Sequence, residues 1–133
     1  MRYQQGKYNV CRKGNIIFFD GEGPWDVMAV KNFHHDVVKL THANFKSDSW
    51  ALLTLFRGNS FFPPDSEQQT VESLISLKGK GLAMLAAVTL ESKADALINY
   101  QMTKIFDLAQ LEAKFTTTKN EALEWLKSRG YSD

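Results

Sequence analysis

One nearly uninterrupted apolar run, residues 82–90, constrains this chain more than any other feature. A β-strand points successive side chains to opposite faces, so a strand that is apolar at almost every position must be buried on both faces. Such strands occur inside parallel sheets whose two faces are covered by helices. Residues 50–56 form a second apolar run of the same kind. The sequence therefore predicts an α/β protein with these two segments as buried strands.

Strand-like and helix-like segments alternate along the rest of the chain. Residues 8–12 and 15–20 are β-prone and flank Lys13-Gly14, which predicts an antiparallel hairpin. The remaining alternation predicts parallel pairing through right-handed crossovers. We expect a five-stranded, mostly parallel mixed sheet with the hairpin at one edge and four helices. The length of 133 residues fits a single domain covering residues 1–133.

The expected helices have recognisable start signals. Apolar residues recur at helical spacing from Trp25 to about Asn44, behind Pro24. Ser66 and Gln69 have the spacing of a capping box, which predicts that Ser66 caps a helix ending near Gly79. A second capping box, Thr118 with Glu121, predicts the start of the last helix.

The charge balance and the single cysteine exclude several classes of protein. With 16 basic and 15 acidic residues, the net charge of +1 argues against a nucleic-acid-binding protein, which needs a concentrated basic face. Cys11 alone cannot form an internal disulfide, which indicates a reducing compartment. The polar start and the absence of an apolar run near the roughly 18 residues of a membrane span predict a soluble cytoplasmic protein without a transmembrane segment.

No metal or cofactor site is predicted from the motifs. His35 and His42 stand two turns apart on the first expected helix, whereas a helical zinc pair is one turn apart. Asp20 and Glu22 follow the second strand and are explained by turn chemistry and the helix dipole. An enzymatic alternative stays open, in which Asp20 or Glu22 works with a histidine of the first helix in a small hydrolase or transferase.

The loop of residues 59–66 is the main candidate for function. It joins the strand of residues 50–56 to the next helix, at the edge where α/β sheets place their binding groups. Two adjacent phenylalanines and stiff prolines suggest that at least one ring is presented to a ligand, a partner or a lipid surface. The alternative is that the loop folds over the sheet and buries both rings. The candidate contact residues are Trp25, Ser60, Phe61, Phe62 and Pro63.

Three segments give the chain a family resemblance. These are Ile16-Ile-Phe-Phe-Asp-Gly21, residues 50–56, and Phe115-Thr-Thr-Thr-Lys-Asn-Glu-Ala-Leu-Glu-Trp-Leu126. In these segments and in the order of its elements, the chain resembles the SpoIIAA-like STAS/Sec14-type small proteins of bacteria. The resemblance implies a sheet of largely sequential strands and a non-enzymatic role in partner binding, regulation or holding an apolar ligand.

The resemblance also implies a phosphorylation site at Ser66. The sporulation branch carries its phosphorylated serine in an Asp-Ser-(Ser/Ala)-Gly type of run, and here the matching run is Asp65-Ser66-Glu67, without the small residue and glycine. We therefore expect a non-catalytic domain without cofactors that binds a protein partner or a small apolar ligand at the rim formed by the loop of residues 59–66. A homodimer and peripheral membrane contact through Phe61 and Phe62 are the further alternatives.

Overall fold

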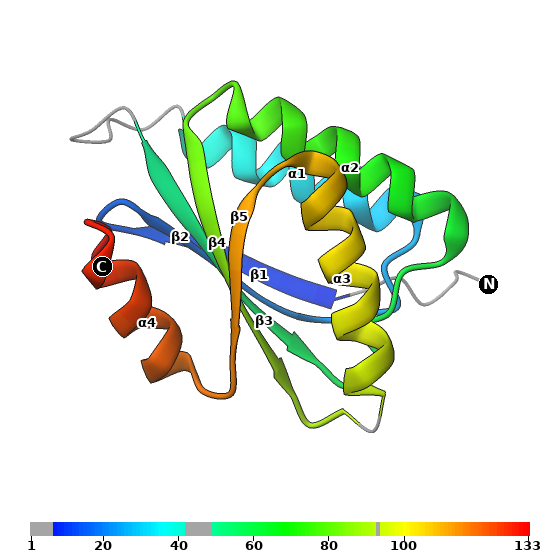
Figure 1. Ribbon diagram of the computed structural model, residues 1–133. Coiled ribbons are helices and arrows are strands. Elements are labelled where there is room, and N and C mark those ends of the chain that lie inside the picture. Colours follow the sequence, from blue (N-terminus) through cyan, green and yellow to red (C-terminus); the bar gives the residue numbers. More distant parts are fainter. Residues whose placement is uncertain (1–6, 42–48, 93) are drawn as a thin grey trace.

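The computed structural model describes residues 7–41, 49–92 and 94–133, and Figure 1 shows their arrangement. Strands and helices alternate after an opening hairpin, as the sequence predicts. The elements are β1 (Lys7–Lys13), β2 (Ile16–Glu22), α1 (Val27–Thr41), β3 (Trp50–Arg57), α2 (Pro64–Lys78), β4 (Leu82–Leu90), α3 (Asp95–Ala109), β5 (Glu112–Thr116) and α4 (Lys119–Ser128).

The five strands form one sheet in the order β1-β2-β3-β4-β5. β1 pairs with β2 antiparallel, through a turn at Gly14 that needs a positive φ of 60°. Each later strand pairs with its predecessor in parallel. The predicted α/β class, the mixed five-stranded sheet and the four helices are thus confirmed.

Helices cover both faces of the sheet, which explains why the central strands are apolar throughout. α1, α2 and α3 lie on one face and α4 on the other (Figure 1). Leu52 and Leu53 are neighbours on β3, yet both are fully buried, Leu52 in the core under the three helices and Leu53 in the core under α4. The parallel strands β2, β3 and β4 end at a common edge, so the loops that follow them lie near one another.

The helix starts differ from expectation at α1 and α2. Trp25 precedes α1, whose first turn is capped by Asp26 through a 2.8 Å bond from the Ala29 N–H. The expected continuation to about Asn44 lies outside the described residues. Ser66 does not cap α2: Pro63 is the N-cap residue, and the Ser66 hydroxyl donates to its carbonyl at 2.8 Å. Pro64 fits the first helical position, so α2 begins before Ser66.

The start of α4 agrees with the sequence. The Thr118 side chain accepts from the Glu121 N–H at 3.1 Å, and the Glu121 carboxylate accepts from the Thr118 N–H at 3.1 Å. The predicted capping box is therefore confirmed, and it begins the one helix that covers the second face of the sheet.

His34 joins the two helices that lie beside each other over the sheet. Its Nδ1 is 2.7 Å from the Ser73 hydroxyl of α2. Burial lowers the pKa of His34, and the charges of Lys80 and His35 lower it further. Protonation therefore favours the unfolded chain, in which the pKa is ordinary.

We expect the stability of the protein to be complete above the ordinary histidine pKa of about 6.5 and to fall as the pH drops through the lower pKa of folded His34. The His34→Gln variant should lose part of this slope in urea unfolding curves recorded from about pH 8 to pH 5. His35→Gln is the control, since His35 is exposed; it should keep most of the slope. Equal slopes in wild type and His34→Gln would contradict the assignment.

Candidate functional site

An apolar cavity of about 50 Å³ lies between the sheet and the three helices on its larger face. Its walls come from three strands, three helices and the two loops at the carboxyl edge. The lining residues are Phe19, Trp25, Ala29, Val30, Phe33, Leu52, Thr54, Phe56, Phe62, Thr70, Leu74, Leu85, Met102, Ile105 and Phe106.

The polar side chains in this wall are two threonines and the indole of Trp25. The Thr70 hydroxyl donates to the Ser66 carbonyl at 2.7 Å, and the Thr54 hydroxyl is directed to the Ala86 carbonyl at 3.5 Å. No residue that lines the cavity is acidic, basic or a histidine. Transferring a charged group into such surroundings is costly, so the cavity suits an uncharged, mainly apolar guest.

The loop of residues 58–63 borders the cavity at the carboxyl edge of the sheet. Phe62 forms part of the wall and is only 6% exposed. The Gln101 side chain of α3 holds the Phe62 backbone with two bonds of 2.9 Å, one to its N–H and one to its carbonyl. On the other side of the loop, the Trp25 N–H donates to the Phe61 carbonyl at 3.0 Å. The loop is therefore tied both to α3 and to the segment that leads into α1.

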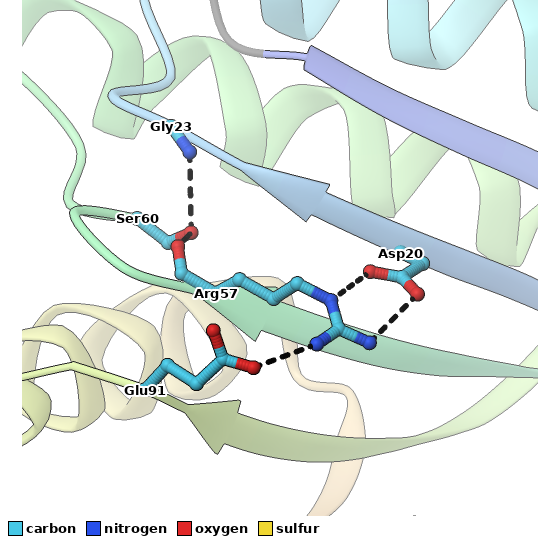
Figure 2. Close-up of polar contacts among 5 residues, drawn as sticks. All are labelled: Asp20, Gly23, Arg57, Ser60 and Glu91. Atoms are coloured by element: carbon cyan, nitrogen blue, oxygen red, sulfur yellow. Dashed lines mark hydrogen bonds and ion pairs between the residues drawn. The ribbon is translucent and has the colours of Figure 1, made fainter.

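Ser60 fixes the beginning of the same loop. Its hydroxyl donates to the Arg57 carbonyl at 2.7 Å and accepts from the Gly23 N–H at 3.2 Å (Figure 2). The side chain has no exposed surface, so Ser60 does not present its hydroxyl at the rim. This differs from the expectation from the sequence, which named Ser60 as a contact residue. Its two bonds satisfy polar groups at a buried position, which is the usual function of a buried hydroxyl.

The structure brings the predicted rim residues together but turns several of them inward. Trp25 is 3% exposed and, like Phe62, lies in the cavity wall. Phe61 and Pro63 are half-buried. The loop therefore does not bury both phenylalanines: Phe62 is buried and Phe61 is partly exposed to solvent. Ser66 is buried as well, so its hydroxyl is not at the surface in this state.

Aromatic packing determines where the Trp25 ring lies. The ring meets Phe19 edge-on with 5.3 Å between centroids, and it meets Phe56 at 6.4 Å. Gly21 leaves space for it, since a Cβ at that position would lie 2.8 Å from Cη2 of Trp25. Edge-to-face aromatic contacts of this kind are directional, so they hold the indole in one orientation.

A polar cluster occupies the same edge of the sheet on the face that carries α4. Arg57 binds both carboxylate oxygens of Asp20, at 2.6 and 3.0 Å, and binds Glu91 at 3.1 Å (Figure 2). The hydrogen bonds and the charge of Asp20 raise the pKa of the guanidinium, which keeps it ionised. All three side chains are partly exposed, so the pairs contribute little to stability. Glu91 adopts a positive φ of 55° at the end of β4.

The enzymatic alternative receives no support from these positions. Asp20 follows Phe19 on β2, so strand alternation places it on the face of the sheet that carries α4. Its carboxylate is bound to Arg57. His34 binds Ser73 on the opposite face. Glu22 lies over Gly58, where a Cβ would be 2.3 Å from its carboxylate. His42 lies outside the described residues.

The described residues form neither a metal-binding cluster nor a membrane-spanning helix. Within residues 7–41, 49–92 and 94–133, no group of three or more histidine, cysteine or acidic side chains could hold a metal ion. In the same ranges, no helix is long and apolar enough to cross a membrane.

Sequence reasoning did not find the cavity. It also did not find the two hydrogen bonds from the Gln101 side chain to the Phe62 backbone, which we call the Gln101 clamp. The cavity depends on how side chains from eight segments meet, which no spacing rule reports. Gln101 precedes Met102 in the buried stripe of α3. A glutamine at the border of an apolar stripe is a weak signal for a backbone-binding residue, since exposed helix positions carry the same side chain.

Comparisons with known proteins found no relative of this chain. No family model, curated protein or solved structure matches the chain.

We expect Gln101→Ala to destabilise the protein by about 1–3 kcal/mol, because the Phe62 N–H and carbonyl lose their partners next to a buried ring. Urea unfolding measures the loss, and amide hydrogen exchange at residues 60–62 should become faster. The matched control is Gln68→Ala, which removes an exposed glutamine bonded only to Glu72. Unchanged exchange in Gln101→Ala would show that the clamp does not hold the loop.

Proposed function

We propose that this protein is a non-catalytic binding domain that holds a small apolar molecule, or the apolar end of a larger one, in the cavity beneath the loop of residues 58–63. The observation that carries the proposal is the cavity itself, which is bounded by aromatic and aliphatic side chains from the sheet and from the three helices that cover it. Binding sites for small molecules are usually concave, mainly apolar and largely formed before the ligand arrives.

The size of the cavity sets what it can take. At about 50 Å³ it exceeds the roughly 10–15 Å³ that one water needs and is about a third of an engineered cavity that holds benzene. A void with an apolar lining stays dry, and its walls lack part of their dispersion contacts. A guest of two to four heavy atoms would restore those contacts, which is the source of the binding free energy.

A non-catalytic role is supported by the separation of the cavity from the ionisable groups of the same edge. Arg57, Asp20 and Glu91 are bound to one another on the α4 face, whereas the cavity lies on the other face. General acid–base chemistry needs a titratable group within hydrogen-bond reach of the substrate. The cavity wall offers none.

Membership of the SpoIIAA-like family is part of the proposal. It is supported by the antiparallel first strand, the sequential strand order and the local signatures of β2 and α4. A fold of this kind does not determine function, so the family supports only the general class of binding or regulatory domain. Partner binding at the half-buried Phe61 and Pro63, a homodimer, phosphorylation of Ser66 and a cytoplasmic location stay predictions.

Xenon is a probe of suitable size for the proposed site. We expect xenon under pressure to give saturable shifts of the methyl resonances of Val30, Leu52, Leu74 and Leu85 in ¹H–¹³C spectra. Ala29→Val should fill the cavity and abolish these shifts, while lowering stability by no more than about 1–3 kcal/mol.

Ala96→Val is the matched control, because Ala96 is an exposed alanine on α3. It should leave the xenon response unchanged. A wild-type protein whose cavity methyls do not respond to xenon would refute the proposed site.

A further inference from the structure

The outer face of α3 carries large hydrophobic side chains that the fold leaves exposed. Among the described residues, five large hydrophobic side chains are at least half exposed, and three of these belong to α3. Leu97 is 50% exposed, Tyr100 69% and Leu108 57%. The contact of α3 with the core is made by other residues, such as the fully buried Ile98 and Met102. The three exposed side chains therefore serve no purpose in the core of this domain.

The helical repeat places these three residues and Lys104 in one row along α3, which we call the α3 stripe. They stand at positions i, i+3, i+7 and i+11. Three turns of an α-helix take about 11 residues, so Leu97 and Leu108 lie almost in line along the helix axis. Single exposed hydrophobic residues are normal on a protein surface, whereas a row over three turns is typical of a helix that packs against a second helix.

The α3 stripe is complementary to itself when one helix is reversed. Reversal about the middle of α3, near Met102, exchanges Leu97 with Leu108 and Tyr100 with Lys104, because the two pairs have nearly the same midpoint in the sequence. An interface with two-fold symmetry requires this property, since residue i meets residue j while j meets i. Two copies of α3 in antiparallel contact would therefore pair leucine with leucine and tyrosine with lysine.

Charge also favours the antiparallel arrangement of two copies. The Lys104 ammonium group would lie near the ring of Tyr100 in the second copy, and ammonium groups are attracted to aromatic faces. In a parallel pair, the two Lys104 groups would face each other and repel. The net charge of the whole chain is only +1, so long-range repulsion between two copies is weak.

A lipid surface fits the α3 stripe less well than a second copy does. Helices that lie on membranes carry basic residues on their polar face, which anionic lipids attract. α3 has two acidic residues, Asp95 and Asp107, against the single basic residue Lys104. The Lys104 ammonium group is also bound to Glu67 of α2 at 3.0 Å. The helix therefore lacks the positive charge that would draw it to a membrane.

We propose that a second copy of this chain docks on the α3 stripe in an antiparallel, two-fold symmetric arrangement. A helix of 15 residues is about 22 Å long, so the pair buries less than the roughly 1,200–2,000 Å² of a standard interface. The dimer is therefore weak, with a Kd of about 0.1 mM. This interface is independent of the cavity and of what the cavity binds.

Sedimentation equilibrium at protein concentrations from about 10 µM to about 1 mM tests the dimer. We expect the average mass to rise from 15.1 kDa towards twice that value. Leu108→Ser should raise the Kd at least about tenfold, because both copies lose an apolar contact. Met28→Ser is the matched control, since Met28 of α1 is 51% exposed and outside the α3 stripe; it should leave the Kd unchanged. Urea unfolding of both variants verifies that they fold.

Two opposite charges at Tyr100 test the antiparallel register. Tyr100→Lys should raise the Kd at least about tenfold, because two lysines then face each other at each end of the contact. Tyr100→Glu should stay within about threefold of wild type, because the carboxylate meets Lys104 of the second copy. An apolar contact in any other register would be weakened by both changes alike.

Each contrary outcome overturns the proposal in a distinct way. A chain that stays at 15.1 kDa at about 1 mM would show that no second copy docks. A dimer that survives Leu108→Ser would have its interface elsewhere, and equal effects of Tyr100→Lys and Tyr100→Glu would refute the antiparallel register. Binding to anionic vesicles that Leu108→Ser abolishes, in a chain that forms no dimer, would assign the α3 stripe to lipid instead. The xenon experiment tests the cavity separately from all of these results.

Discussion

The burial of β3 and β4 on both faces is the constraint on which the remaining structure depends. Because neighbouring residues such as Leu52 and Leu53 point to opposite sides and are both buried, each face of the sheet needs a cover of its own. α1, α2 and α3 supply one cover and α4 the other (Figure 1). The right-handed crossovers that place these helices also bring the ends of β2, β3 and β4 to one edge, where the loops close over the larger core.

The two faces of the sheet differ in the side chains that cover them, and the cavity lies on the more aromatic face. The larger face contains several aromatic rings near the carboxyl edge, among them Phe19, Trp25 and Phe56. Edge-to-face contacts fix the orientation of these rings, which line the cavity together with aliphatic side chains of the helices. The core under α4 is mainly aliphatic, with Leu53 and Leu126 fully buried and Tyr131 as a buried aromatic residue. The cavity lies in the aromatic layer.

Patterns with a short range predicted most of the fold. The apolar runs of β3 and β4, the hairpin at Gly14 and the capping box of Thr118 each depend on residues close in sequence, and each is present. Ser66 shows the limit of such patterns, because a proline at the first helical position takes precedence over a serine with capping-box spacing.

The sequence predicted the edge of the sheet at which the loop lies, but it did not predict that the loop turns side chains inward. The loop of residues 59–66 does lie at the edge where binding groups collect, yet its inward orientation depends on Gln101, 39 residues beyond Phe62, and on Trp25 from a different loop. Contacts of this range leave no periodic signal in a sequence. The Trp25 indole N–H, which is buried without a hydrogen-bond partner among the described residues, likewise follows from the packing of rings from three segments, and the identity of the residue alone does not reveal it.

The Gln101 clamp has a consequence for kinetics. A guest that enters past Phe62 must wait until the two clamp bonds open together. At about 1 kcal/mol each, these bonds hold the open form to roughly one molecule in thirty or fewer. Entry and exit are slowed by the same factor when they use the same route, so the clamp prolongs the residence of a bound molecule without changing its equilibrium affinity. In the proposed binding domain, Gln101 of α3 would therefore set how long a guest stays bound.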